Sequence, residues 1–372
     1  MRVVYVVPHA TRGGAERVTM DLVALHDHRV VEPAAIFLED GPLVAETRAL
    51  GIPAQVLHVP RMRNVLASIP AKRVLASRLM TLRADLVHGV MAWGHAYAGA
   101  AARIARIPAV WFQHDVPDWH KPVNVLAALT RAKRILVNSA LTAKAQRRFN
   151  PRRVRIEIVH PGTQIPAEPR QVRRARGRAA LGCDGDAFLI GMVARLARGK
   201  GHATLLHAAR SLCSARPDAA VIIAGEALFG LDQDYPAELR RLVQALGLAD
   251  RVQFAGGALD AGDVISALDV AVHVPDGPES YGLAVVEGMA AGTAVVAGDS
   301  GAVREVVVPG ETAMLVPTGD HEALATALLA LHDDPARRER MGLAAADAAG
   351  ERFDMRKTAR RVEKIYEDAL AR

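Results

Sequence analysis

Short apolar runs alternate with stretches of helical period along the first 160 residues of the chain. Runs of four to six mainly hydrophobic residues are too short for helices and are typical of buried strands. They cover residues 3–7, 34–38, 55–59, 85–90, 109–113, 135–138 and 156–159. Because strands covered on both faces lose the apolar–polar alternation, the pattern predicts a parallel sheet wrapped by helices.

A second series of the same kind follows residues 161–182, a proline-broken segment with the basic run RQVRRARGR that is typical of a connection between domains. Its predicted strands cover residues 188–193, 220–224, 252–255, 270–274, 294–297 and 313–316. Helices are predicted near residues 202–215, 236–246, 261–268, 282–291 and 322–331. The last helix, residues 355–370, has an apolar face made of Val362, Ile365, Tyr366, Ala369 and Leu370. Two Rossmann-like halves are therefore expected, with a ligand cleft between facing carboxyl edges.

The composition agrees with two globular domains. A chain of 372 residues with 51% hydrophobic residues is long enough for two packed cores. Cys183 and Cys213 are too few for a disulfide framework or a zinc site, which indicates a reducing compartment. Residues 3–7 are too short for a signal peptide, and no apolar run approaches transmembrane length. We therefore expect a soluble, cytoplasmic protein.

The positive charge is concentrated in the first part of the chain. Residues 1–168 carry 23 Lys and Arg against 12 Asp and Glu, whereas the remainder carries 24 against 28. Residues 61–83 hold six cations and residues 119–156 hold ten, with no acid in either run. A solvated face is the usual explanation, and the functional alternative is a surface for anionic lipid or an anionic acceptor, which implies peripheral attachment to the inner face of the membrane. Nucleic acid is a weaker alternative, since no binding signature accompanies the charge.

The most informative stretch is residues 275–296, PDGPESYGLAVVEGMAAGTAVV. Glu279 and Glu287 lie eight positions apart between two predicted strands. A helix that begins at Gly282 presents unpaired N–H groups and the positive end of its dipole, which suits a phosphate. Glu287 lies between one and two turns further along and could point back toward that helix end. Two solvated carboxylates on a surface helix are the structural alternative.

A basic loop follows the first strand of the second half, running from Arg195 through Leu-Ala-Arg-Gly to Lys200 and Gly201. An Arg that forks onto two oxygens, a Lys that acts as a point charge and a glycine that lets the backbone approach can clamp a diphosphate. The loop is not a Walker A motif, because the required spacing is absent and His202 follows the last glycine. Considered alone, the stretch also fits a solvated loop.

Two further patterns lie at predicted strand ends. Gly13 and Gly14 follow the first strand, where a doubly wound sheet brings ligand to backbone, but the full dinucleotide fingerprint is absent. His114 and Asp115 close another strand at the same kind of edge. His114 there is either a hydrogen-bonding group near a reacting centre or a structural residue.

The paired acids Asp184-Gly-Asp186 and Asp232-Gln-Asp234 resemble signatures that hold a divalent ion against a nucleotide diphosphate. The first pair precedes a strand instead of following one, and the second lies in a loop. Arg195 and Lys200 can neutralise phosphate by themselves, so no metal is predicted.

With these residues in hand, the chain resembles the retaining glycosyltransferases of family 4, over nearly its whole length. The segment from Glu279 to Gly292 looks like the family's E-x7-E motif with its following A-x-G, and Arg195 with Lys200 looks like its diphosphate clamp. The string GGAE that starts at Gly13 resembles its glycine loop. The resemblance implies the α/β GT-B fold, with two Rossmann-like domains facing each other across a cleft. Residues 1–168 would bind the acceptor and residues 169–353 the donor, and a C-terminal helix, residues 354–372, would pack back on the first domain.

The resemblance also implies roles for single residues. Arg195 and Lys200 would neutralise the pyrophosphate of a nucleotide-sugar, and Glu287 would bind its ribose. Glu279 would contact the donor sugar, and His114 would lie near the reacting carbon. The implied catalytic set is His114, Glu279, Arg195 and Lys200; the donor-binding set is Gly13, Gly14, Arg195, Lys200, Glu279, Tyr281, Gly282, Leu283 and Glu287; the acceptor side is Glu16, Asp115 and Trp119.

The leading hypothesis is therefore a retaining hexosyltransferase that needs no metal or other cofactor. Its donor is a nucleotide-diphosphate sugar, with UDP as the first choice of nucleotide and GDP as the second. Its acceptor is a glycan, a lipid-linked molecule or a small molecule, as in the synthesis of cell-surface glycan precursors. The alternatives are a GT-B nucleotide-sugar epimerase or hydrolase, which would need no acceptor, and a non-catalytic sugar-binding protein.

Overall fold

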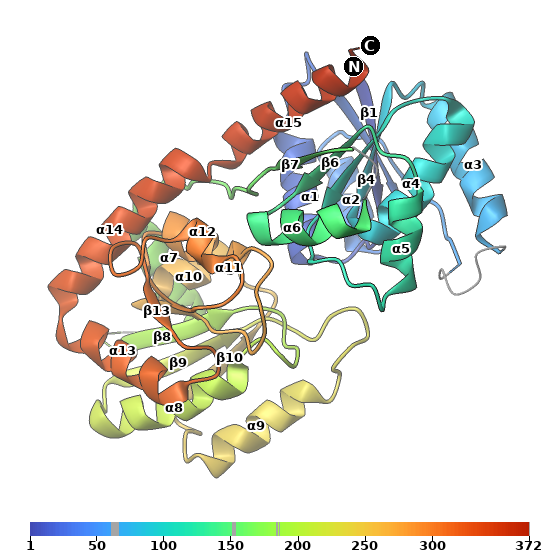
Figure 1. Ribbon diagram of the computed structural model, residues 1–372. Coiled ribbons are helices and arrows are strands. Elements are labelled where there is room, and N and C mark those ends of the chain that lie inside the picture. The colour runs from blue at the N-terminus through green and yellow to red at the C-terminus, as the bar shows by residue number, and fades with distance from the viewer. Residues whose placement is uncertain (61–66, 151–153, 184, 186, 372) are drawn as a thin grey trace. The chain divides into compact units, whose positions relative to one another are not determined.

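The computed structural model describes residues 1–60, 67–150, 154–183, 185 and 187–371. The chain divides into two compact units (Figure 1), one of Met1–Gly162 with Met355–Arg372 and the other of Thr163–Asp354. This division falls earlier than the predicted boundary at residue 168, because Thr163 already pairs with Asp354 and its N–H donates to the Phe353 carbonyl, at the end of the second unit.

The first unit is a parallel sheet in the order β3-β2-β1-β4-β5-β6-β7, as far as the described residues extend. Its strands are β1 (Arg2–Val7), β2 (Glu32–Phe37), β3 (Ala54–Val56), β4 (Leu86–Val90), β5 (Ala109–Gln113), β6 (Arg134–Val137) and β7 (Arg155–Ile158). Its helices are α1 (Gly14–Leu25), α2 (Pro42–Ala49), α3 (Ser68–Thr81), α4 (Met91–Ala105), α5 (Pro122–Leu129), α6 (Ala140–Phe149) and α15 (Met355–Leu370). The chain winds outward from β1 and returns to β4 beside it, so the carboxyl ends of β1 and β4 mark a topological switch point.

The second unit repeats this architecture with a parallel sheet in the order β10-β9-β8-β11-β12-β13. Its strands are β8 (Phe188–Val193), β9 (Ala219–Ala224), β10 (Val252–Gly256), β11 (Val270–His273), β12 (Ala294–Gly298) and β13 (Met314–Val316). Its helices are α7 (Arg170–Leu181), α8 (His202–Ala215), α9 (Tyr235–Ala245), α10 (Ala261–Ala267), α11 (Leu283–Ala290), α12 (Val303–Val306), α13 (His321–Asp333) and α14 (Pro335–Arg352). The strands predicted in both halves are therefore confirmed, and here the switch point lies between β8 and β11.

The C-terminal helix α15 is fastened to the first unit by a chain of buried hydrogen bonds. Glu363 Oε1 lies 3.0 Å from His26 Nδ1, and His26 Nε2 lies 2.6 Å from the Tyr5 hydroxyl. The Tyr5 hydroxyl lies 2.8 Å from that of Tyr366, which lies 2.6 Å from His88 Nδ1. These hydrogen bonds join α15 to β1, to β4 and to the end of α1.

The donor and the acceptor of every hydrogen bond in this network follow from the charge of Glu363. Burial raises the pKa of Glu363, but Arg360, the Asp27 N–H and His26 outweigh burial and lower it, so the carboxylate is ionised and can only accept. His26, whose pKa is lowered mainly by burial, must then donate from Nδ1 and accept at Nε2 from Tyr5. Tyr5 in turn accepts from Tyr366, which accepts from His88.

We predict that Tyr366→Phe lowers the free energy of unfolding of the first unit by about 2 kcal/mol, since the buried Nδ1–H of His88 loses its acceptor and Tyr5 loses its donor. Trp93, Trp111 and Trp119 are the tryptophans of the chain, so their fluorescence in urea reports on this unit. Tyr97→Phe is the matched control, because that hydroxyl makes one hydrogen bond, to the Pro60 carbonyl, and its loss should cost about 1 kcal/mol. Equal costs for the two variants would contradict the network.

The loops that leave the carboxyl ends of β8 and β11 are tied together through their backbones. The N–H of Asp276 donates to the carbonyl of Gly199 at 3.0 Å. Gly201 has a φ of +85°, and a Cβ placed on it would lie 1.8 Å from the carbonyl oxygen of Val274. Gly199, two residues earlier, has nearly the same φ of +84° but open space around it. Close approach of the two loops therefore requires glycine at position 201.

Gly201→Ala should loosen this contact far more than Gly199→Ala does. Both substitutions place a side chain in the left-handed region at a cost of about 1 kcal/mol, but only the first also collides with backbone, which should raise its cost to about 3 kcal/mol. Amide hydrogen exchange over residues 194–201 and 270–282 measures the difference locally, without assuming that two units unfold together. The same protection in both variants would show that the contact at Gly201 does not hold the loops.

Candidate active site

A buried carboxylate lies at the switch point of the second unit. The side chain of Glu279, which follows β11, is 14% exposed. Its Oε2 atom lies 3.0 Å from Nε2 of His273, the last residue of β11, and 3.8 Å from Nζ of Lys200, in the loop after β8. Because a carboxylate can only accept, the proton of the His273 ring must be on Nε2. Two residues of the predicted site, Glu279 and Lys200, are thus brought together from different loops.

The partners of Glu279 keep it ionised. Burial by itself raises the pKa of the carboxyl group, as desolvation does for any acid. The hydrogen bond and charge of His273, followed by the charge of Lys200, outweigh burial and lower the pKa to about 2. Glu279 is therefore a permanent acceptor, suited to hydroxyl donors such as those of a sugar and unsuited to act as a general acid at neutral pH.

The backbone of Glu279 is held by the turn after β12. Its N–H donates to the Ser300 hydroxyl at 3.3 Å, and its carbonyl accepts from the Ala302 N–H at 2.9 Å. Gly301 lies between them with a φ of +59°, and a Cβ on it would lie 2.0 Å from the Glu279 carbonyl oxygen. The position of the carboxylate is therefore fixed by its backbone as well as by its partners.

The basic loop after β8 carries two arginines in different situations. The guanidinium of Arg198 pairs with Asp232, Asp234 and Glu238, at 3.0, 2.9 and 2.5 Å. The paired acids considered for a metal at 232 and 234 are therefore engaged by an arginine, and Asp184 and Asp186 lie outside the described residues. Within the described ranges no three His, Cys, Asp or Glu side chains are grouped as a metal ion requires. Arg195, by contrast, has its guanidinium over the Phe229 ring, 5.6 Å from the centroid.

The helix that follows Glu279 has the features of an anion-binding terminus. Gly282 precedes α11 with a φ of +101°, and no side chain caps the helix start. Glu287 is half-buried on this helix, and Leu283 is its first residue. The ring of Tyr281 is buried against Phe353, and the Tyr281 backbone is hydrogen-bonded to the Glu279 carboxylate.

The remaining predicted residues lie in the first unit, at or near the carboxyl edge of its sheet. His114 follows β5 and is buried, with its ring stacked on Phe112 and its Nε2 without a partner among the described residues. Burial lowers the pKa of His114 to about 3, so the ring is neutral at neutral pH. Such a ring can accept or donate one further hydrogen bond.

The glycine loop follows β1 in the sequence, and the predicted acceptor residues Asp115 and Trp119 follow β5. Gly13 caps α1 in extended conformation and Gly14 begins that helix, with Glu16 buried in its first turn. Asp115 is exposed beside His114. The half-exposed ring of Trp119 stacks on the ring of Phe149, with 3.8 Å between the ring centroids. Each of these residues is therefore placed in the first unit, while Arg195, Lys200, Glu279 and Glu287 are in the second.

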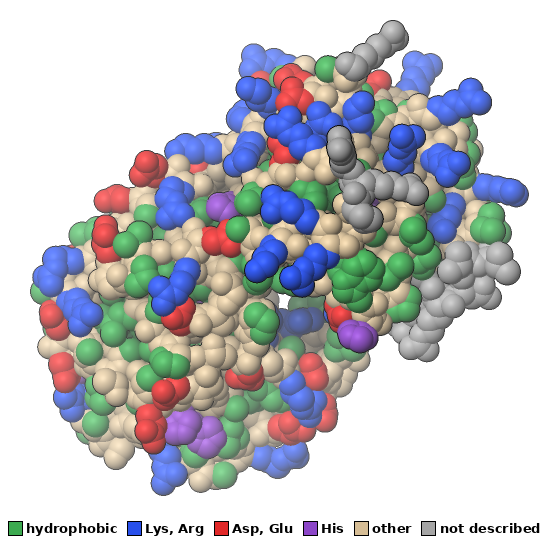
Figure 2. Space-filling model, viewed as in Figure 1, with side chains coloured by type: hydrophobic (Ala, Val, Ile, Leu, Met, Phe, Trp, Pro, Cys, Tyr) green, Lys and Arg blue, Asp and Glu red, His purple; other side chains and the backbone are tan. Residues whose placement is uncertain are grey.

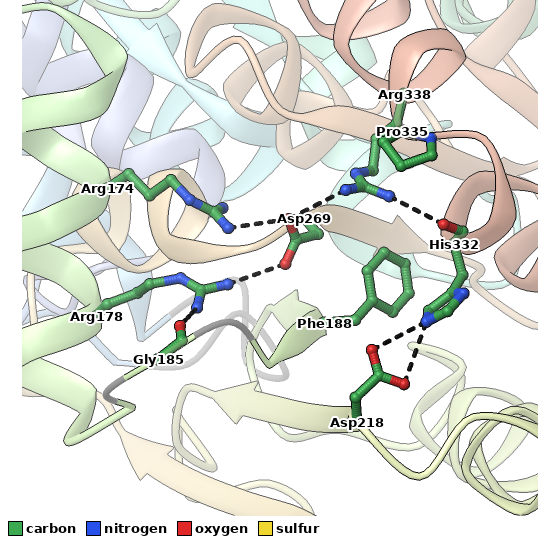
Figure 3. A pocket seen from close by; sticks show the side chains of 9 residues that line it. All are labelled: Arg174, Arg178, Gly185, Phe188, Asp218, Asp269, His332, Pro335 and Arg338. Atoms are coloured by element: carbon green, nitrogen blue, oxygen red, sulfur yellow. Dashed lines mark hydrogen bonds and ion pairs between the residues drawn. The ribbon is translucent and has the colours of Figure 1, made fainter.

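The cavity drawn in Figure 3 lies at the other edge of the second sheet. It has a volume of about 490 Å³ and is lined by Arg174, Arg178, Gly185, Phe188, Asp218, Asp269, His332, Pro335 and Arg338. Phe188 begins β8 and Asp269 precedes β11, so these are amino ends of strands, and Glu279 follows a carboxyl end. Arg174 and Arg178 donate to Asp269 and to carbonyls at the end of α10. They tie α7 to the end of α10 and the start of β11, so the cavity lies apart from the cluster around Glu279.

His273 and Gly301 are the site residues that the sequence prediction missed. A histidine at the end of an apolar strand matches no motif, although its place at a carboxyl edge before Glu279 is a signal that could have been used. Gly301 becomes informative only when its contact with the Glu279 backbone is known.

Known proteins resemble both halves of the chain. The family model for Glycosyltransferase Family 4 matches residues 12–165, and that for glycosyl transferases group 1 matches residues 174–348. The D-inositol 3-phosphate glycosyltransferase of Streptomyces avermitilis is 31% identical over 264 residues, which are 68% of this chain and 56% of that protein. The phosphatidyl-myo-inositol mannosyltransferase of Mycobacterium leprae is 38% identical over 170 residues, 45% of this chain and 43% of that protein. The matched segments thus span about half the length of these relatives.

A solved structure resembles the whole chain. Anabaena HepE, crystallised in complex with UDP and glucose, superposes with a TM-score of 0.87, is 25% identical and is covered over 99% of both chains. With the two sheets, their switch points and the two family models, the chain belongs to the glycosyltransferases of the GT-B fold, with a Glycosyltransferase Family 4 domain followed by a glycosyl transferases group 1 domain.

Proposed function

We propose that this protein is a retaining glycosyltransferase that moves a hexosyl unit from a nucleotide-diphosphate sugar to an acceptor, without a metal ion. The observation that carries the proposal is the cluster of Lys200, His273 and Glu279 at the β8/β11 switch point. It offers a cation for phosphate and an ionised acceptor for sugar hydroxyls within 3.8 Å of each other. Glycosyl transfer from a nucleotide-sugar needs both.

The proposed catalysis is electrostatic. As the bond to the anomeric carbon breaks, negative charge grows on the β-phosphate, and groups already placed to meet that charge lower the barrier. Lys200, Arg195 and the free N–H groups at the start of α11 are assigned this role. Glu279 holds the sugar, and Glu287 holds the ribose. The acceptor hydroxyl attacks the anomeric carbon from the face that the phosphate leaves, and the leaving phosphate takes the hydroxyl proton.

UDP is the proposed nucleotide, because HepE, which the chain resembles over its full length, was crystallised with UDP and glucose. GDP is the second choice. We propose that the first unit binds the acceptor, with His114 at the reacting centre and Glu16, Asp115 and Trp119 on the acceptor side. The relatives named for inositol 3-phosphate and phosphatidyl-myo-inositol support a phosphorylated polyol or its lipid as the first acceptors to try.

Lys200→Ala should raise the Kd for UDP-glucose about 10- to 100-fold, since a charge-assisted contact with phosphate is worth about 1.5–3 kcal/mol, and transfer should fall at least as much. Calorimetry gives the Kd, and release of UDP with acceptor present gives the rate. Lys200 is the single lysine between residues 163 and 354, so its acetylation, read by mass spectrometry, should also be blocked by donor. Lys144→Ala, in α6 of the first unit, is the control.

An unchanged turnover in Lys200→Ala would overturn the assignment of the clamp. Incubation with donor alone separates the transferase from its alternatives, because an epimerase or hydrolase consumes UDP-glucose without any acceptor and a sugar-binding protein does not consume it at all. Full activity after treatment with a chelator is expected for metal-independent transfer.

We also propose that the first unit docks on anionic membrane through α3. Lys72, Arg73 and Arg78 lie on this helix, which has no acid, and Ile69 and Met80 are exposed on the same stripe as Arg73. In Figure 2 Lys and Arg side chains gather over the first unit. Cations interspersed with exposed apolar side chains suit a lipid surface. Residues 61–66 and 151–153 of the predicted basic runs lie outside the described residues, and none of the helices described is long and apolar enough to cross a membrane.

Vesicles with anionic lipid should therefore retain the protein in a flotation assay, and neutral vesicles should not. Each of Arg73→Glu and Met80→Glu should weaken retention about 5- to 30-fold, because each removes a favourable contact of about 1 kcal/mol and adds a repelled charge. Arg241→Glu, an exposed position on α9 of the second unit, is the matched control. Equal retention of all variants would favour the plain solvated face.

A further inference from the structure

We infer that Glu279 competes with the donor's phosphate for Lys200, so that the site discriminates between a nucleotide-sugar and the bare nucleotide diphosphate. The inference rests on the proposed function and assigns a second role to a residue proposed there for sugar contact. Its basis is the ion pair between Lys200 Nζ and Glu279 Oε2 in the free protein, at 3.8 Å. The cation assigned to phosphate is thus already occupied before any ligand arrives.

The Ser280 N–H donates to Oε1 of Glu279 at 3.0 Å, and the two side-chain partners at Oε2 are not equivalent. His273 is fixed on β11, and its Nε2 donates to Oε2 at 3.0 Å with a side chain that is only 7% exposed. Lys200 sits on a loop with a side chain that is 31% exposed, and its long stem can reorient. When phosphate enters, Lys200 is the partner that moves, and His273 remains.

A nucleotide diphosphate without sugar gains Lys200 only by taking it from Glu279. The carboxylate then keeps His273 and the Ser280 N–H but loses its ammonium partner, and at 14% exposure it has little water to replace that charge. Carboxylate and phosphate also approach the same cation from two sides, and like charges repel. Binding of the nucleotide alone is therefore weakened by Glu279.

A nucleotide-sugar does not have this cost. Its sugar hydroxyls donate hydrogen bonds to the Glu279 carboxylate, which replace the contact with Lys200 and leave the ammonium to the phosphate. After transfer the sugar is gone, Glu279 again attracts Lys200, and the hold on the nucleotide product weakens. The same ion pair thus favours substrate binding over product retention, which matters wherever product release limits turnover.

The test compares UDP with UDP-glucose in wild type, Glu279→Gln and the exposed control Glu311→Gln. The amide keeps the shape of Glu279 and one oxygen for the His273 N–H; it gives up the bond from the Ser280 N–H and has no charge to attract Lys200. In Glu279→Gln, UDP should bind about 3- to 10-fold more tightly, because a competing partly exposed ion pair is gone, while UDP-glucose binds at least about 10-fold more weakly. Glu311→Gln should change neither Kd.

The acetylation rate of Lys200 in the free protein gives a second readout that needs no nucleotide. It should rise several-fold in Glu279→Gln, because a lysine side chain released from its carboxylate can reorient to meet the reagent. Wild type that binds UDP-glucose, together with unchanged or weaker UDP binding in Glu279→Gln, overturns the competition and leaves the proposed function standing. Wild type that binds neither ligand overturns the proposed function, and the acetylation rates still decide whether Glu279 restrains Lys200.

Discussion

An ionised carboxylate with little exposure to water is the constraint on which the candidate site depends. Removing a charge from water costs several kcal/mol unless partners replace the lost hydration. Glu279 finds those partners in His273, at the end of β11, and Lys200, after β8. They can meet only because β8 and β11 are adjacent in the sheet, and adjacency of strands far apart in sequence is what defines a switch point.

The sheets themselves could be predicted because their inner strands are buried on both faces. All residues of β4, β5 and β12 are buried, so each appears in the sequence as a mainly apolar run. Helix α14 was not predicted, although Asp334 caps it and Pro335 stands in its first turn. Its buried face is made largely of small residues, and a Cβ on Gly342 would lie 2.4 Å from the Gly292 carbonyl oxygen. Close packing of backbones leaves no periodic pattern of large apolar side chains.

The candidate site could be predicted only where spacing carries the chemistry. Glu279, Glu287 and Lys200 stand at distinctive positions in recognisable strings, whereas the value of His273 comes from a hydrogen bond across a loop. The network at α15 shows the same limit. The amphipathic pattern places Tyr366 on the buried face, but the burial of Glu363 beside it follows from His26, more than 300 residues away in the sequence.

Charge balance connects the residues that are proposed to bind the donor. Lys200 is paired with Glu279, so the diphosphate of the proposed donor would meet fewer available cations than the sequence suggests. Arg198, another cation of the same loop, is already paired with three acids. The groups that remain for phosphate are Arg195, the start of α11 and Lys200, to the extent that the ligand displaces Glu279 from it. In the proposed site, a sugar that engages Glu279 would also strengthen phosphate binding, because it determines how much of the charge of Lys200 the phosphate receives.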